Sequence, residues 1–260
     1  MLTLDGYKNK SVVVSGCYSG IGRAVSEFLI ELGASVHGLD IKAPDLPLAS
    51  FSTLDLSDPV SIDATAIKLN FPIDALFNCA GLAPTKDPRA VVKVNIIGLR
   101  YLTEQLVPLM PAGAGIVSIG SNGGAGWRKK IPLHEEFLAT RTYSEAVSWW
   151  DSHSSDLNAY NFSKEAIVVW TMQQSSVLIK RGIRVNCTSP GAVQTPMLDE
   201  IESAFSSTAV DTVAQPIGRR STAREQAIPL VMLNSELFSY VNGIDMPVDG
   251  GFIASRLFAK

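Results

Sequence analysis

The feature that most constrains the fold of this chain is an alternation of short extended runs with helix-like segments. Six runs rich in β-branched and other apolar residues predict β-strands: Ser11–Ser15, Ser35–Asp40, Ile73–Asn78, Gly115–Ser121, Ile183–Ser189 and Tyr240–Val248. Between the first two, the segment from Gly20 to Gly33 has apolar residues at helical spacing and a glycine suited to end a helix. Strands separated by helices run parallel and are covered on both faces, so the pattern predicts a doubly wound α/β domain with a parallel sheet.

Length and composition favour one domain. The chain has 260 residues, of which 46% are hydrophobic and 18% charged, and no segment resembles a linker, so we expect a single domain over residues 1–260. The net charge of −3 and the scattered lysines and arginines argue against nucleic-acid binding. The first residues are polar, and no apolar run reaches the roughly 18 residues of a membrane span. We therefore expect a soluble, cytoplasmic protein without membrane contact.

Cysteines and histidines give no sign of a metal site. Three cysteines stand far apart without Cys-x-x-Cys spacing, and three histidines lack the spacing of metal ligands. They are Cys17, Cys79, Cys187, His37, His134 and His153. The odd number of cysteines also argues against a disulfide framework. We expect reduced thiols and no bound metal, and we assign the histidines no functional role.

A glycine-rich turn follows the first expected strand and opens the first expected helix. Glycines permit a tight turn and let the backbone approach a pyrophosphate that lies on the helix N-terminus. The cofactor-binding candidates here are Gly16, Ser19, Gly20, Ile21 and Gly22. Asp40, at the tip of the second strand, can accept both ribose hydroxyls of an adenosine and would repel a 2′-phosphate, so NAD is favoured over NADP, although Lys42 nearby weakens that preference. An ordinary glycine-rich turn is the alternative, and this context disfavours it.

Tyr160 and Lys164 are four residues apart, a spacing that places a phenol beside an ammonium on one face of a helix. A tyrosine with its ordinary pKa near 10 is a poor base at neutral pH. A cation about 4 Å away, at an effective dielectric constant of about 20, contributes about 4 kcal/mol, or roughly three pKa units. The pair therefore predicts a tyrosine whose pKa is lowered toward neutrality. Taken alone the pattern is common, and a solvated helix face is the alternative interpretation.

Several motifs appear in the order typical of one protein family. They are Gly16-x-x-x-Gly20-x-Gly22, Asp55-Leu56, Asn78-Cys79-Ala80-Gly81, Asn95, Ser121, Tyr160-x-x-x-Lys164, Pro190-Gly191 and Val248-Asp249-Gly250-Gly251. Over nearly the whole chain this order resembles the short-chain dehydrogenases/reductases. The resemblance implies a single Rossmann domain and an enzyme that uses a nicotinamide cofactor to interconvert a small-molecule alcohol and a carbonyl compound.

The resemblance also implies roles for individual residues. Tyr160 would be the acid/base, Ser121 the hydrogen-bond partner of the substrate oxygen, and Lys164 the residue that tunes Tyr160 and holds the nicotinamide ribose. Asn95 would anchor a water that relays protons from Lys164 to solvent. The other motif residues would bind the cofactor: Asp55 and Leu56 at the adenine, Asn78, Ala80 and Gly81 at the centre, and Thr195, after Pro190 and Gly191, at the carboxamide.

Residues 122–158 contain an insertion before the catalytic tyrosine. Ser121 and Tyr160 lie 39 positions apart, whereas about a dozen positions separate them in most of the family that the chain resembles. We expect a helical insertion that forms part of the substrate site, with Leu133, Phe137 and Leu138 on one stripe and a second helix that begins at a capping box of Thr142 and Glu145. Trp127, Trp149 and Trp150 could stack on a substrate ring, but we expect Trp149 and Trp150 to pack in the core.

The chain resembles two bacterial branches of the family, 3α-hydroxysteroid dehydrogenase/carbonyl reductase and, more closely, coniferyl-alcohol dehydrogenase. The second resemblance includes Leu99–Glu104, Gly124–Trp127, Leu133-His134, Lys164–Trp170 and Asn242–Gly251. Because loops near an active site vary with substrate, the match within the insertion favours an aromatic alcohol of the coniferyl type. A 3α-hydroxysteroid or another carbonyl compound is the alternative substrate.

A second wall of the substrate site is expected from residues 197–215, a segment that commonly closes over substrate in the family that the chain resembles. Leu198, Ile201 and Phe205 form a stripe at helical spacing that would face the substrate. In many of those proteins two long helices pair subunits into tetramers, and the insertion would block that pairing, so we expect a homodimer.

A protein that binds NAD as a regulator, without turnover, is an alternative of another class. The set of Asn95, Ser121, Tyr160 and Lys164 disfavours it, because a sensor has no use for an aligned acid/base.

Overall fold

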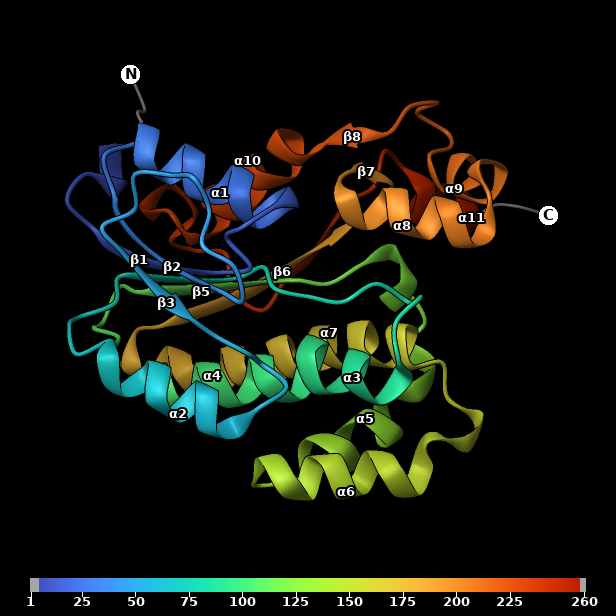
Figure 1. Cartoon of the computed structure of the whole chain (residues 1–260), viewed down its shortest axis with the longest axis horizontal. Coiled ribbons are helices and arrows are strands. Elements are labelled where there is room, and N and C mark those ends of the chain that lie inside the picture. Colours follow the sequence, from blue (N-terminus) through green and yellow to red (C-terminus); the bar gives the residue numbers. More distant parts are fainter. Residues whose placement is uncertain (1–4, 258–260) are drawn as a thin grey trace.

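A seven-stranded parallel sheet lies at the centre of the computed structural model, which describes residues 5–257 (Figure 1). The strand order is β3-β2-β1-β4-β5-β6-β9, and all neighbouring strands are parallel. The strands are β1 (Ser11–Ser15), β2 (Ser35–Asp40), β3 (Ser50–Thr53), β4 (Ala75–Asn78), β5 (Gly115–Ile119), β6 (Arg184–Pro190) and β9 (Asp245–Val248). The chain moves outward from β1 to β3 and then returns to β4 on the other side of β1. Such a reversal is the point at which an open α/β sheet binds its ligand.

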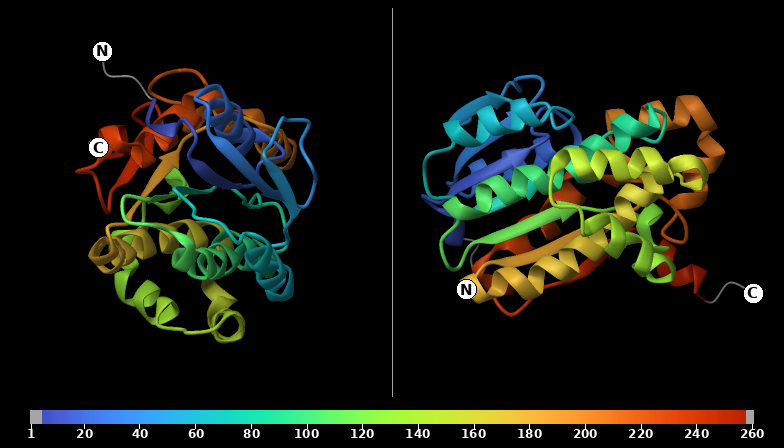
Figure 2. Two further views of the ribbon diagram at one scale, coloured as in Figure 1. Left: turned by 90° about the vertical axis from the view of Figure 1, so that its left-hand side faces the viewer. Right: turned by 90° about the horizontal axis from the view of Figure 1, so that it is seen from below.

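Helices cover both faces of the sheet, which confirms the doubly wound α/β prediction (Figures 1 and 2). One face carries α1 (Gly20–Glu31) and α10 (Ala223–Asn234); the other carries α2 (Pro59–Lys68), α3 (Pro88–Val92), α4 (Leu99–Leu106) and α7 (Ala159–Leu178). The remaining elements include α8 (Pro196–Phe205), α9 (Ser207–Val213), α11 (Phe252–Arg256) and a small separate pair, β7 (Val193–Gln194) with β8 (Ser221–Thr222). Among residues 5–257, no helix combines the length and the apolar character needed to cross a membrane.

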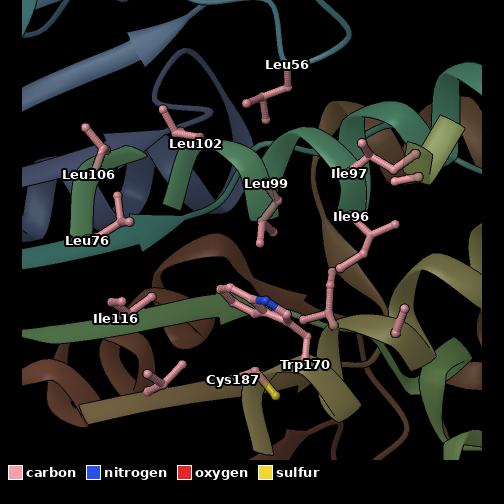
Figure 3. Close-up of a cluster of buried hydrophobic side chains, with 14 of the residues drawn as sticks. Leu56, Leu76, Ile96, Ile97, Leu99, Leu102, Leu106, Ile116, Trp170 and Cys187 are labelled. Atoms are coloured by element: carbon pink, nitrogen blue, oxygen red, sulfur yellow. The ribbon is translucent and has the colours of Figure 1, made fainter. Parts of the chain in front are cut away.

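Alternation along β1 explains why its sequence is apolar throughout. Val12 and Val14 point into a core shared with α1 and α10, whereas Val13 points into a second core shared with α2, α4 and α7. In the second core, Trp170 of α7 lies between β5 and α4 (Figure 3). Successive side chains of a strand face opposite sides of the sheet, so a sheet buried on both sides requires continuous apolar runs.

Each predicted run contains a strand, but the predicted bounds agree fully only for β1 and β2. β1 and β2 have the predicted bounds, whereas β4 begins at Ala75, β5 ends at Ile119, β6 lies one residue later than predicted and β9 begins only at Asp245. The segment before β9 does not continue the strand, because the φ of +78° at Gly243 lies outside the extended region. Tyr240, in the same segment, is fully exposed. The edge strand β3 was not predicted, because its partly exposed residues form no buried apolar run.

The insertion forms two helices, α5 (Ile131–Leu138) and α6 (Tyr143–His153), on the side of α3 and α7 that faces away from the sheet (Figures 1 and 2). The prediction of a helical insertion is therefore confirmed. The capping box is half formed. Thr142 Oγ1 accepts a hydrogen bond from Glu145 N at 3.1 Å, but the Glu145 carboxylate accepts from Arg141 N instead of from Thr142 N.

Phe162 of α7 is the ring on which the insertion packs. Its ring centre lies 5.1 Å from those of His134 and Phe137, 5.3 Å from that of Trp150 and 5.6 Å from that of Trp149. The prediction that Trp149 and Trp150 belong to the core is confirmed, and Trp127 is buried in the same core. The aromatic residues of the insertion thus cover the outer face of α7.

Candidate active site

A cavity of about 510 Å³ opens where the strands end, beside the switch point next to β1. The predicted site residues that line it are Gly16, Ser19, Gly20, Ile21, Gly22, Asp40, Asp55, Leu56, Ala80, Gly81, Ser121, Tyr160, Lys164, Pro190, Gly191 and Thr195. Asn78 and Asn95 are not part of the lining. Parallel strands bring these segments together because their carboxyl ends meet at one edge of the sheet.

The glycine-rich turn has the shape of a dinucleotide cradle. A Cβ atom at Gly16 would lie 2.6 Å from Ala80 Cα, and one at Gly22 would lie 2.1 Å from Gly16 O. Gly20 has a φ of +58°, in the left-handed region that favours glycine. Ser19 is the N-cap of α1, and its side chain makes no capping hydrogen bond. The first N–H groups of α1 therefore remain available to a pyrophosphate, and these residues fit a bound dinucleotide.

Asp40 is fixed at the tip of β2 by two backbone donors. Tyr18 N donates to its Oδ2 at 3.0 Å and Lys42 N to its Oδ1 at 3.3 Å. The Lys42 ammonium lies over the Tyr18 ring, 5.6 Å from the ring centre. The cavity thus presents, at the tip of β2, a carboxylate that two backbone N–H groups fix in place.

Ser121 and Tyr160 converge on one point of the cavity. Ser121 follows β5 and accepts a hydrogen bond from Gly123 N at 3.1 Å, which fixes the position of its Oγ. Tyr160 lies in the first turn of α7, whose N-cap is Asn158. A Cβ atom at Gly123 would lie 3.5 Å from Ser121 Oγ and 3.4 Å from Tyr160 Cε1. An oxygen of a substrate placed between the two could bond to both side chains.

The predicted effect of Lys164 on Tyr160 is wrong for this geometry. Burial raises the pKa of Tyr160 above its usual value, and a hydrogen bond with Ser121 opposes that rise. Lys164 Nζ lies 5.8 Å from the centre of the Tyr160 ring and donates to Ile119 O at 2.8 Å. Burial also lowers the pKa of Lys164 to about 8, against an opposing effect of Cys79. Burial of the phenol therefore sets the direction of the shift, which is opposite to the predicted one.

The two asparagines lie behind the cavity wall. Asn95, in a π-helical segment, accepts from Leu82 N at 2.7 Å and donates to Leu82 O at 3.1 Å, so its amide holds the loop after β4. Asn78 donates to Thr103 Oγ1 at 3.0 Å and is buried against α4. The structure differs here from the expected lining role of Asn78, because this last side chain of β4 points to α4.

Three further predicted residues, Asp55, Leu56 and Thr195, make hydrogen bonds that hold the segments around the cavity. Asp55 Oδ1 accepts from Ser57 N at 2.7 Å, and Leu56 O accepts from Tyr143 Oη of the insertion at 3.1 Å. Thr195 caps α8, since its Oγ1 accepts from Leu198 N at 3.3 Å.

The cavity that contains Tyr160 also has apolar lining residues. They include Leu82, Ala90, Val94, Met197, Leu198 and Ile201. Ala90 and Val94 are not among the predicted site residues, although their spacing of four residues is that of neighbours on one helix face. Phe205 does not take part, because α8 ends at this residue and leaves its side chain 60% exposed.

The insertion does not line the cavity as expected. None of the lining residues within the described chain belongs to 122–158. The apolar side chains of α5 and α6 pack on Phe162 instead, on the opposite side of α7 from the cavity.

Comparison with known proteins assigns nearly the whole chain to one family. Residues 10–132 match the family model described as short chain dehydrogenase, and residues 140–253 match the one described as enoyl-(acyl carrier protein) reductase. The chain is 36% identical to the coniferyl-alcohol dehydrogenase of Pseudomonas sp. (strain HR199 / DSM 7063), over 95% of this chain and 98% of that protein.

Two further relatives are 3α-hydroxysteroid dehydrogenases. The 3-alpha-hydroxysteroid dehydrogenase/carbonyl reductase of Comamonas testosteroni is 30% identical, over 94% of this chain and 96% of that protein. The crystal structure of the 3-alpha-hydroxysteroid dehydrogenase from Pseudomonas sp. B-0831, complexed with NADH, has a TM-score of 0.80 and 28% identity, and the match covers 96% of this chain and all of that one. Fold, site and relatives agree, and the chain belongs to the short-chain dehydrogenase/reductase family of oxidoreductases.

Proposed function

We propose that this protein is an NAD-dependent alcohol dehydrogenase that acts on an aromatic primary alcohol of the coniferyl type. The observation that carries the proposal is a cavity lined both by Tyr160 and Ser121 and by apolar side chains, in a chain that is similar to a coniferyl-alcohol dehydrogenase over nearly its whole length. An apolar pocket with a few convergent polar groups suits an aromatic ring that carries one reactive hydroxyl group.

The side chains around the reactive point divide the chemistry between them. In alcohol oxidation Tyr160 Oη, as phenolate, takes the hydroxyl proton, while Ser121 Oγ donates a hydrogen bond to the same oxygen. Bound NAD would supply the acceptor for the hydride that leaves the carbinol carbon. The raised pKa of Tyr160 keeps a proton on the phenol, which suits the reverse reaction, in which Tyr160 protonates the carbonyl oxygen. Lys164, whose ammonium lies 5.8 Å from the centre of the Tyr160 ring, would bind the nicotinamide ribose.

The preference for NAD over NADP rests on Asp40. Its carboxylate is held by two backbone N–H groups at the adenosine end of the cavity, where a 2′-phosphate would meet a like charge. The rest of the cofactor would be held by the glycine-rich turn and by further lining residues, namely Asp55, Leu56, Ala80, Gly81, Pro190, Gly191 and Thr195.

A 3α-hydroxysteroid is the second candidate substrate. Similarity to 3α-hydroxysteroid dehydrogenases in both sequence and fold favours it. Initial rates of NADH formation with coniferyl alcohol and with a 3α-hydroxysteroid, measured in parallel, separate the two candidates. The proposal predicts a clear preference for coniferyl alcohol, and a preference for the steroid would overturn the assignment of substrate.

The proposal includes a cytoplasmic homodimer. Its support is that α5 and α6 cover α3 and α7, so those helices cannot pair with a second subunit.

A further inference from the structure

Helix α7, which carries Tyr160 and Lys164, contacts the cavity with one face and the insertion with another. Tyr160 and Lys164 face the cavity, whereas Phe162 and Glu165, three residues apart, face the insertion. Glu165 is only 3% exposed, although carboxylates are rarely buried without partners. Its position directly after Lys164 suggests a role linked to the active site.

Two side chains of the insertion hold the Glu165 carboxylate. Lys130 Nζ donates to both carboxylate oxygens at 3.0 Å, and His134 Nε2 donates to Oε2 at 3.2 Å. His134 is fully buried, and its Nδ1 has no partner among the described residues, so its one hydrogen bond is the one to Glu165. Burying these charged and polar groups costs more desolvation free energy than filling the core with apolar side chains would. Their hydrogen bonds, however, have defined directions and therefore fix the positions of the residues that make them.

The same carboxylate contacts the loop that leads away from Ser121. A Cβ atom at Gly126 would lie 2.6 Å from Glu165 Oε1, and one at Gly124 would lie 2.9 Å from the carbonyl carbon and oxygen of Lys164. The loop therefore rests directly on α7 at Lys164 and Glu165. Gly124 N donates to Ser121 O at 2.8 Å, which ties the resting loop to Ser121.

We propose that Glu165 is a positioning residue for the dehydrogenase reaction. With Lys130 and His134 it clamps the loop 121–126 onto α7, so that Ser121 Oγ and Tyr160 keep their facing positions. The insertion then serves catalysis from behind the catalytic helix and not as a wall of the substrate site. This inference rests on the proposed function for its kinetic test.

The test compares Glu165→Gln with wild type and with Glu135→Gln, a matched control on the exposed face of α5. Glutamine keeps the shape but turns an N–H₂ group toward the donors Lys130 and His134. We expect kcat with coniferyl alcohol to fall about 10- to 100-fold, as small misplacements of catalytic groups cause, with the NADH Kd unchanged within about twofold. In hydrogen–deuterium exchange, peptides covering 121–130 should exchange faster while the rest of the chain is unchanged. Glu135→Gln should behave as wild type.

Lys130 provides a second, milder variant, because its side chain is 44% exposed. Lys130→Met should lower kcat in the same direction, and Lys130→Arg, which can bond to both carboxylate oxygens, should retain it. This pair decides the question if Glu165→Gln does not fold.

Two results would overturn the proposal. One is an unchanged kcat in Glu165→Gln. The other is a loss of kcat accompanied by weaker NADH binding and faster exchange throughout the chain, which would indicate general destabilisation. If the wild-type protein oxidised neither alcohol, the proposed function would fail, and the exchange of peptides 121–130 would still test the clamp.

Discussion

Asp40 is the residue from which cofactor preference is argued, and its charge can be removed without disturbing the core. Because its carboxylate would repel a 2′-phosphate, we expect Asp40→Ser to lower kcat/KM with NAD and to raise it with NADP, each by about 10- to 100-fold. Asp45→Asn removes a charge from the exposed loop nearby and serves as the control. Rates with both cofactors at matched concentrations give the ratio, and an unchanged ratio would contradict the role of Asp40.

Lys164 yields a prediction about stability. Its pKa is about 8 in the folded chain against an ordinary value of 10.5, so the unfolded chain binds more protons between these values and stability rises with pH in that window. Below pH 8 the buried ammonium carries its full desolvation cost. We expect Lys164→Met to raise the free energy of unfolding at pH 7 by about 1–3 kcal/mol, net of the lost bond to Ile119 O, and the gain to vanish near pH 10.5. Urea unfolding of both proteins across this pH range measures the change in the free energy of unfolding. A variant less stable than wild type at pH 7 would contradict the prediction.

At the level of elements, α8, which contributes residues to the cavity lining, is tied to the loop after β4. Glu200 of α8 accepts from Thr85 Oγ1 and pairs with Lys86 Nζ at 2.9 Å, and both partners lie in the loop after β4. An exposed pair of this kind is worth up to about 1 kcal/mol, so we expect Glu200→Gln to raise the substrate KM about two- to fivefold. Asp199→Asn, on the exposed side of α8, should leave KM unchanged. About 1 M NaCl screens the ion pair and should raise the KM of wild type close to that of Glu200→Gln. A difference in KM that remains at this salt concentration would contradict a role of the Lys86–Glu200 ion pair.

The elements that sequence predicts well are those fixed by local physics. β1 and β2 carry continuous apolar runs, and α1 carries a helical stripe that ends at a glycine, so their positions follow from burial. β3 could not be predicted, because an edge strand is defined by its neighbour's hydrogen bonds. The site residues of the glycine-rich turn and Asp40 were predictable from motif and topology. The direction in which α5 and α6 face was not, because Phe162 is one apolar residue among many in α7 until its partners are known.

The pKa of Tyr160 belongs to the same class of unpredictable features. Sequence places a cation four residues away, but the sign of the shift depends on how far burial removes water from the phenol. The burial of the Tyr160 phenol is known only once the cavity around it has been assembled.

At the scale of the whole molecule, the two sides of the sheet differ in their suitability for subunit contact. The insertion covers α7 and α3, whereas Ile228 of α10 and, between α10 and the edge strand β9, Leu237, Tyr240 and Ile244 are exposed. We expect a homodimer with these apolar side chains at the contact, since burying apolar surface stabilises association. Light scattering should give twice the chain mass, and Tyr240→Glu should give monomers. A tetramer mass would contradict this account of the insertion.

The role of Tyr160 in transferring a proton during NAD-dependent alcohol oxidation can be tested by measuring NADH formation from coniferyl alcohol in Tyr160→Phe and in wild type. The phenylalanine keeps the ring and removes only the hydroxyl group that would accept the proton. We expect the variant to form NADH about 10²- to 10⁴-fold more slowly and to bind NADH as tightly as wild type does. Turnover that survives the substitution would contradict this role of Tyr160.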